Sequence, residues 1–176
     1  MEEADEARLS QAIRLAQKYD TILLYLGLTD LAESEGGDRP HMRLPEDQLR
    51  LVTALTSLNK KIVVVLSGGS PVELPFINAV SALLNLYLPG QCGGEAGTRL
   101  LFGEAVPSGK LAETYPLSLE DTPCYGNFAA HGLTSEYREG LFVGYRYYDS
   151  AQKPVCFPFG FGLSYTRFAY HDLQLS

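Results

Sequence analysis

Three continuous apolar runs of strand length lie in the first half of the chain, and they constrain its fold more than any other feature. The runs are Thr21–Leu28 (TILLYLGL), Lys61–Leu66 (KIVVVL) and Ala82–Leu88 (ALLNLYL). All three are far shorter than the roughly 20 apolar residues that span a bilayer. A short run that is apolar at nearly every position is typical of a strand buried on both faces, as in parallel sheets.

Amphipathic helical patterns precede or follow these runs. Helices are expected over Glu3–Lys18, over the stretch that begins near Pro45 and extends past Leu55, and over Glu95–Phe102. The first of them begins with acidic residues and ends with a lysine, which suits the helix macrodipole. This alternation predicts an α/β fold: a three-layer sandwich whose mostly parallel sheet has helices on both faces.

The second half of the chain has a different character. From about Val106 the regular alternation fades, and proline, glycine and aromatic residues crowd the stretch Tyr115–Tyr170. This stretch has too few periodic apolar segments for a core of its own, so we expect an irregular, aromatic-rich C-terminal tail wrapped on the domain. The total of 176 residues fits one domain of about 100–200 residues, and a single domain over residues 1–176 is expected.

Charge and cysteine usage exclude several classes of partner. Fourteen basic against twenty-one acidic residues give a net charge of −7, which argues against nucleic acid and anionic membranes. The acidic amino end lacks the pattern of a signal peptide, and a cytoplasmic location is expected. Neither a cofactor nor a metal is expected, because the three cysteines and three histidines are scattered: Cys92, Cys124, Cys156, His41, His131 and His171.

The most informative stretch is Ala32–Pro45, which follows the first expected strand. Loops at the carboxyl ends of parallel strands are where such sheets bind ligands. Two interpretations of this stretch remain open: a solvated, charged loop, or a loop whose glutamates act as general acids. The ionisable residues concerned are Glu33, Glu35, Asp38, Arg39 and Arg43.

A second glycine-rich stretch, Gly90–Gly97 (GQCGGEAG), precedes an expected helix. A helix amino terminus can receive a phosphate, but the spacing is not that of a dinucleotide-binding loop and no basic residue lies within it. Close packing of helix on strand is the preferred explanation, which argues against a flavodoxin-like nucleotide binder.

Five motifs together resemble one known family, the C-terminal α/β sandwich domain of family 3 glycoside hydrolases, especially of bacterial β-glucosidases. The resemblance runs from about Asp20 to Phe168, and Ala169–Ser176 resembles the lead-in to a fibronectin type III-like domain. The motifs are ESEGGDRPHMRLP, VVVLSGGSPVELP, LPGQCGGEAGTRLLFGEAVPSGKLAETYP, YREGLFVGYRYYD and FPFGFGLSYTRF.

The resemblance implies an active site between two domains. A (β/α)8 barrel, absent from these residues, supplies an aspartate nucleophile, and the sandwich domain supplies a glutamate acid/base on the loop after its first strand. Such a pair performs retaining hydrolysis. The matching residues are Glu33 and Glu35; Glu35, directly before the Gly-Gly-Asp-Arg sequence, is preferred. Asp38 and Arg39 are expected to form an ion pair that braces the loop, or Arg39 faces a sugar hydroxyl or the neighbouring domain.

The function implied is that of the sandwich domain of a retaining β-glucosidase-like hydrolase, inactive without its barrel. The expected partners are a β-linked oligosaccharide or aryl glycoside and the barrel domain, and exposed apolar surface is expected to favour self-association into homo-oligomers. The alternative is a non-catalytic carbohydrate-binding or scaffold module of the same fold. The motifs Tyr137–Asp149 and Phe157–Tyr165 are interpreted as scaffold, and Ser67–Ser70 either borders the cleft or is a turn.

Overall fold

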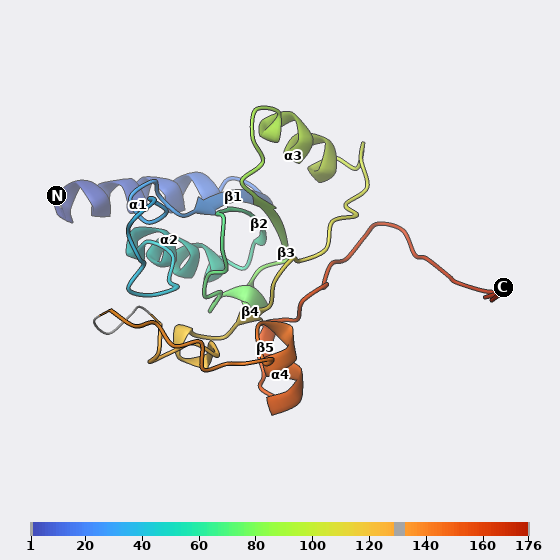
Figure 1. Cartoon of the computed structure of the whole chain (residues 1–176). Coiled ribbons are helices and arrows are strands. Elements are labelled where there is room, and N and C mark those ends of the chain that lie inside the picture. Colours follow the sequence, from blue (N-terminus) through green and yellow to red (C-terminus); the bar gives the residue numbers. More distant parts are fainter. Residues whose placement is uncertain (1, 129–132, 176) are drawn as a thin grey trace.

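A parallel sheet organises the first half of the chain. The computed structural model describes residues 2–128 and 133–175, with side chains from residue 5 onward. The strands β1 (Thr21–Gly27), β2 (Lys61–Ser67) and β3 (Ala82–Tyr87) pair in the order β1-β2-β3 (Figure 1). All pairings are parallel, with Leu24 beside Val64 and Val64 beside Leu83. The three apolar runs are thus adjacent strands, and their carboxyl ends meet at one edge of the sheet.

Two helices lie on one side of this sheet. The helices α1 (Glu2–Ala16) and α2 (Glu46–Thr56) pack against each other, and an ion pair joins Arg50 to Glu6. The buried face of α2 belongs to the main hydrophobic core, together with one face of β1 and β2. The central members of this core are Leu24, Leu26, Val52, Leu55, Ile62, Val64 and Leu66.

The other face of the sheet is covered only in part. The helix α3 (Gly93–Leu101) packs there against β3, where Gly97 lies so close to Leu86 that a Cβ on the glycine would come within 3.2 Å of its Cδ1. On the same face, Leu23 and Tyr25 of β1 remain 45% and 65% exposed. The predicted α/β class with a parallel sheet is confirmed, and α3 accounts for part of the predicted third layer.

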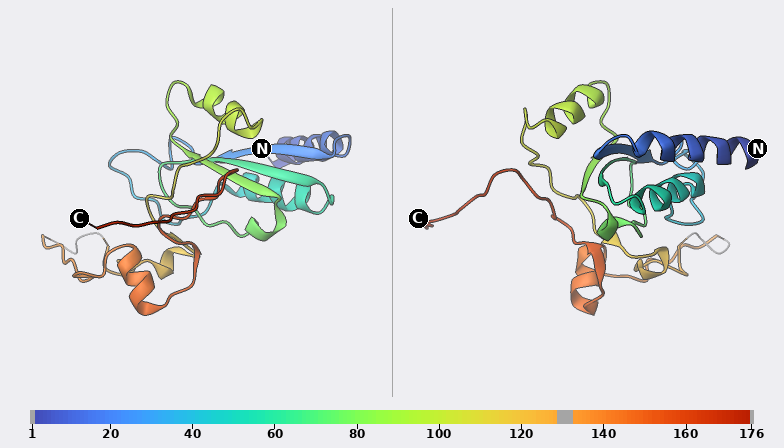
Figure 2. Two further views of the ribbon diagram at one scale, coloured as in Figure 1. Left: turned by 90° about the vertical axis from the view of Figure 1, so that its right-hand side faces the viewer. Right: turned by 180° about the vertical axis from the view of Figure 1, so that it is seen from behind.

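The second half of the chain contains short helices and strands that no periodic sequence pattern predicts. The strand β4 (Tyr115–Pro116) pairs antiparallel with β5 (Val155–Phe157), and the helix α4 (Tyr145–Ala151) precedes β5. Short 3₁₀ helices cover Ile77–Ala79 and Leu119–Asp121. The predicted tail is thus anchored through β4, whose Tyr115 lies in the core. After β5 the chain stays attached to the body, because Gly160 and Phe161 hydrogen-bond to Leu111 and the Tyr165 hydroxyl donates to Leu100 O at 2.9 Å. Only the segment beyond these contacts extends away from the molecule (Figure 2).

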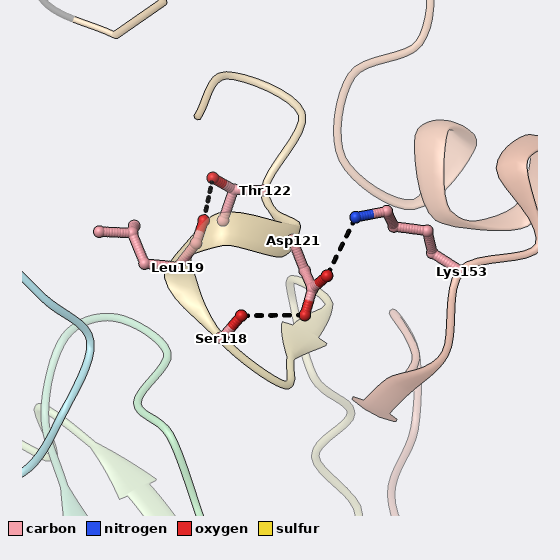
Figure 3. Close-up of polar contacts among 5 residues, drawn as sticks. All are labelled: Ser118, Leu119, Asp121, Thr122 and Lys153. Carbon is pink, nitrogen blue, oxygen red and sulfur yellow. Dashed lines mark hydrogen bonds and ion pairs between the residues drawn. The ribbon is translucent and has the colours of Figure 1, made fainter. Parts of the chain in front are cut away.

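A polar network joins the segment after β4 to Lys153, two residues before β5 (Figure 3). Lys153 Nζ donates to Asp121 Oδ1 at 3.0 Å, and Ser118 Oγ donates to Asp121 Oδ2 at 3.1 Å. The hydrogen bond from Lys153 lowers the pKa of the Asp121 carboxyl below its ordinary value of about 3.8, and the Ser118 hydroxyl acts in the same direction. A carboxyl with a lowered pKa in the folded state stabilises the fold only while it is ionised.

Asp121→Asn should therefore lower the melting temperature at pH 7, but only by about 1–3 °C, because the Lys153 and Asp121 side chains are 32% and 29% exposed and solvent screens their interaction in part. The carboxylate contributes fully above the unfolded-state pKa, and its contribution disappears as the pH falls through the lower folded-state pKa. Thermal melts of the variant and the wild type should therefore converge once the pH is below the folded-state pKa of Asp121. Asp149→Asn, at an exposed position in α4, is the control. An unchanged difference at low pH would contradict the assignment.

Candidate active site

The candidate site lies at the edge of the sheet where β1 and β2 end. The loop after β1, residues 28–45, carries all five ionisable residues singled out in the sequence. The loop after β2, residues 68–76, lies beside it because β1 and β2 are neighbouring parallel strands. Binding sites of open parallel sheets form at this edge, between such loops.

The loop 28–45 is held firmly at both ends. At its start, the Gln48 side chain of α2 accepts from Gly27 N and donates to Gly27 O, both at 3.0 Å. Near its end, Met42 O accepts a hydrogen bond from Glu73 N at 2.8 Å. One end is thus tied to α2 and the other to the loop after β2.

Glu33 bridges the two loops. Its Oε1 accepts a hydrogen bond from Gly69 N at 2.7 Å and lies 3.5 Å from Ser70 Oγ. A Cβ at position 69 would come within 3.2 Å of this carboxylate oxygen and within 3.1 Å of Leu88 Cδ1, so glycine makes the close approach possible. The Glu33 carboxylate is therefore engaged within the protein itself.

Arg39 forms a second bridge, and its partners differ from the expected ones. Its Nη2 donates to Ser70 Oγ at 2.9 Å and to Pro71 O at 3.1 Å. Over the described parts of the chain no ion pair joins Arg39 to Asp38, whose side chain is exposed. The loop is braced by Arg39, but through the loop after β2 and not through its own neighbour.

Glu35 lies between these two bridges at the tip of the loop. Gly36, with φ +79°, follows it in the left-handed region that glycine adopts readily, and Gly37 N closes a turn onto Ser34 O. The Glu35 side chain is exposed, and within residues 2–128 and 133–175 it forms no hydrogen bond or ion pair. Its carboxyl is accessible to a ligand or to a second domain.

A carboxyl that the sequence did not single out lies behind the site. Glu113 is half-buried, and burial raises its pKa while the positive charge of Arg39 partly opposes the increase. Glu113 is therefore a nearby negative charge for Arg39, whose Nη1 is buried without a hydrogen-bond partner in the described structure. Nothing in the local sequence LAETYP distinguishes this glutamate from a surface residue, because its neighbour Arg39 comes from a distant loop.

Two residues after Glu113, a buried tyrosine connects β4 to the sheet. The Tyr115 hydroxyl accepts a hydrogen bond from Asn85 Nδ2 at 2.9 Å, and burial is the largest cause of the raised pKa of Tyr115. Burial likewise raises the pKa of Tyr87, at the end of β3. The bond between Asn85 and Tyr115 ties β4 to β3. Asn85 and Tyr87 belong to a strand that the sequence predicts, whereas the two-residue strand of Tyr115 has no pattern from which to predict it.

The remaining motifs have structural explanations. Gly97 allows α3 to approach β3, as expected for the glycine-rich stretch. Tyr145 stacks on Phe159 with ring centroids 5.0 Å apart, which joins the two aromatic motifs and supports their interpretation as scaffold. No group of three or more potential metal ligands occurs among the described residues, and His131 lies outside them. No helix in the described part is long and apolar enough to span a membrane.

Comparison with known families agrees with this architecture. The model of the glycosyl hydrolase family 3 C-terminal domain matches residues 2–165. The chain belongs to this family. Among curated relatives, this family 3 domain is 50% identical to the thermostable beta-glucosidase B of Acetivibrio thermocellus over 171 residues. It is 43% identical to an exo-alpha-(1->6)-L-arabinopyranosidase of Bifidobacterium breve over 169 residues.

Solved structures show the same fold. The β-glucosidase of Kluyveromyces marxianus in complex with glucose matches 92% of this chain with a TM-score of 0.89 and 40% identity. The family 3 β-glucosidase of Bifidobacterium adolescentis matches 91% with a TM-score of 0.88 and 44% identity. The alignments with the two curated relatives cover 97% and 96% of this family 3 domain. They cover only 23% and 22% of the relatives' own lengths. The domain spans 20% and 24% of the two structures.

Proposed function

We propose that this family 3 domain forms part of a retaining, β-glucosidase-like glycoside hydrolase and supplies Glu35 as its general acid/base. The observation that carries this proposal is the contrast between two neighbouring glutamates. Glu33 is bonded to the backbone of the next loop, whereas the exposed Glu35 lies between two anchored residues. An acid/base must be held in place and must reach its substrate, and Glu35 meets both requirements.

Retaining hydrolysis needs a second carboxylate about 5–5.5 Å from the first. In the proposal an aspartate of a (β/α)8 barrel domain attacks the anomeric carbon while Glu35 protonates the departing oxygen. Glu35 then removes a proton from the water that hydrolyses the glycosyl-enzyme. The substrate class is a β-linked oligosaccharide or aryl glycoside, which the β-glucosidase names of the relatives support.

Arg39 and Asp38 have different parts in this proposal. The two hydrogen bonds of Arg39 to the loop after β2 support a role in bracing. Asp38, exposed near the same tip as Glu35, is assigned to contact with sugar hydroxyls. Carboxylates accept hydrogen bonds from hydroxyl groups through two oxygens, and such contacts orient a bound sugar.

Exposed apolar side chains support the proposed barrel partner. A short stretch that leads into α4 and includes its first residue leaves large apolar side chains in solvent, and exposed apolar patches mark interaction sites. The same surface would favour self-association of the isolated chain. The residues are Leu141, Phe142, Val143 and Tyr145, with exposed fractions from 46% to 79%.

The test compares the isolated chain with an assembled enzyme. The assembled enzyme is the Acetivibrio thermocellus relative in which this chain replaces the equivalent segment. The isolated chain should fold but fail to hydrolyse aryl β-glucosides, because it holds only one of two required carboxylates. The assembled enzyme should hydrolyse them. Steady-state release of the aryl group measures both.

Two outcomes would contradict the proposal. Robust turnover by the isolated chain, lost on Glu35→Gln, would show a self-contained site. An assembled enzyme that is folded and inactive, together with calorimetric binding of glucose by the isolated chain, would instead identify a non-catalytic carbohydrate-binding module.

A further inference from the structure

Ser70 lies where the two bridges between the loops meet. Its hydroxyl accepts a hydrogen bond from Arg39 Nη2 at 2.9 Å and lies 3.5 Å from Glu33 Oε1, toward which it can donate. Glu33 and Arg39 flank Glu35 on the two sides along the chain. One hydroxyl on the loop after β2 therefore contacts both side chains that hold the Glu35 tip.

We propose that Ser70 is a positioning residue, whose hydroxyl sets the place of the Glu35 carboxyl by linking Glu33 to Arg39. This inference rests on the proposed role of Glu35. Ser70 itself touches neither substrate nor reacting atoms.

The polar atoms around Ser70 explain why its hydroxyl matters. Without it, Arg39 Nη2 keeps only the carbonyl of Pro71, while Nη1 is already buried without a partner in the described structure. A partly buried guanidinium with unmet donors is costly, because its desolvation is no longer offset by hydrogen bonds. The arginine is then expected to move toward solvent or toward Glu113, and the loop moves with it.

Between the two bridges, the side chains of Ser34, Glu35 and Asp38 form no hydrogen bond in the described structure. Glu35 is two residues from Glu33 and four from Arg39, and the intervening Gly36 and Gly37 have no side chains to pack. The only recorded backbone hydrogen bond within the tip is the turn from Gly37 N to Ser34 O, at 3.4 Å. A shift of either bridge is therefore passed to the carboxyl, and misplacement by about 1 Å can cost a hundredfold in rate.

The experiment uses the assembled enzyme and a substrate with a poor leaving group. Ser70→Ala should lower kcat by about 10- to 100-fold with KM changed by less than about threefold, because the sugar contacts remain while the proton donor is misplaced. Ser70→Thr, which keeps a hydroxyl, should restore most of the rate. Ser81→Ala, an exposed serine beside the amino end of β3, is the matched control and should behave as wild type.

A double-variant cycle separates positioning from a general effect on folding. In the Glu35→Ala background, Ser70→Ala should cause no further loss, because it acts through the missing carboxyl. An equal loss in both backgrounds, or wild-type kinetics for Ser70→Ala, would overturn the inference while leaving Glu35 as the acid/base. Unaltered kinetics for Glu35→Ala would overturn the proposed function itself.

A second variant covers the case in which Ser70→Ala folds poorly. Ser70→Cys fills the space of the hydroxyl with a slightly larger thiol that is only a weak hydrogen-bond donor and acceptor, so it should show the same loss in kcat with little change in melting temperature. Wild-type kcat for a folded Ser70→Cys enzyme would overturn the inference.

Discussion

Glu35→Ala in the assembled enzyme is expected to abolish most hydrolysis of substrates with poor leaving groups, by a factor of about 10²–10⁴. That range is the usual rate enhancement by general acid catalysis, and the departure of a poor leaving group requires the full enhancement. Activated aryl glucosides need little protonation, so their first step should survive better. Their second step should slow, because no base remains to activate water.

Azide provides the decisive measurement for this variant. It is an anionic nucleophile that needs no general base, so it should attack the glycosyl-enzyme directly and restore turnover of activated aryl glucosides. Two displacements at the anomeric carbon give the retained anomer, so the product should be a β-glucosyl azide. Product analysis by NMR distinguishes it from the α-anomer.

Glu33→Ala is the matched control for Glu35→Ala, since both remove a glutamate carboxylate from the same loop. Glu33 is bonded to Gly69 N, so its loss should weaken loop order or binding without rescue by azide. Rescue with Glu33→Ala alone would transfer the acid/base role to Glu33. Rescue with neither variant would place the acid/base outside this loop.

The parallel sheet could be predicted from the sequence because its signal is local. Each of the three apolar runs is a strand within two residues of its expected ends, and α2 begins directly after Pro45, as its pattern indicated. Parallel strands that are buried on both faces consist of nearly continuous apolar residues, which can be recognised in the sequence. The position of the charged loop at the carboxyl edge followed from the same pattern.

The interactions of that loop could not be predicted, because they depend on residues far apart in the chain. Arg39 lies beside Asp38 in sequence, yet its partners are Ser70 and Pro71, 31 and 32 residues away. Glu33 likewise bonds a backbone group 36 residues away. Sequence spacing shows only which residues are close along the chain. The edge of the sheet brings together the loop after β1 and the loop after β2, which are far apart in sequence.

The short elements of the second half escaped prediction for another reason. The β4–β5 pair contains only two and three residues, which is too few to establish an alternation of two. The helix α4 has seven residues, three of them tyrosines, and no apolar stripe. Tertiary packing, such as the burial of Tyr148, decides these segments.

Gly27→Ala is expected to have the largest effect on stability among single changes at the sheet edge. A Cβ on Gly27 would lie inside van der Waals contact of the Ser67 carbonyl oxygen on the neighbouring strand. That oxygen accepts a hydrogen bond from Leu28 N at 3.1 Å, and Gln48 holds Gly27 through both of its backbone polar groups. Neither strand can withdraw without breaking these bonds.

The expected loss is about 3 kcal/mol in the free energy of unfolding, the upper part of the range for overpacking, measured by urea denaturation of the isolated chain. Gly68→Ala is the matched control: its Cβ would meet only the Leu28 side chain, at 3.4 Å or beyond. This control should lose less than about 1 kcal/mol. Equal losses for the two variants would mean that the ends of β1 and β2 separate easily. The loop with Glu35 would then have no rigid base, and the positions of both bridges would need another explanation.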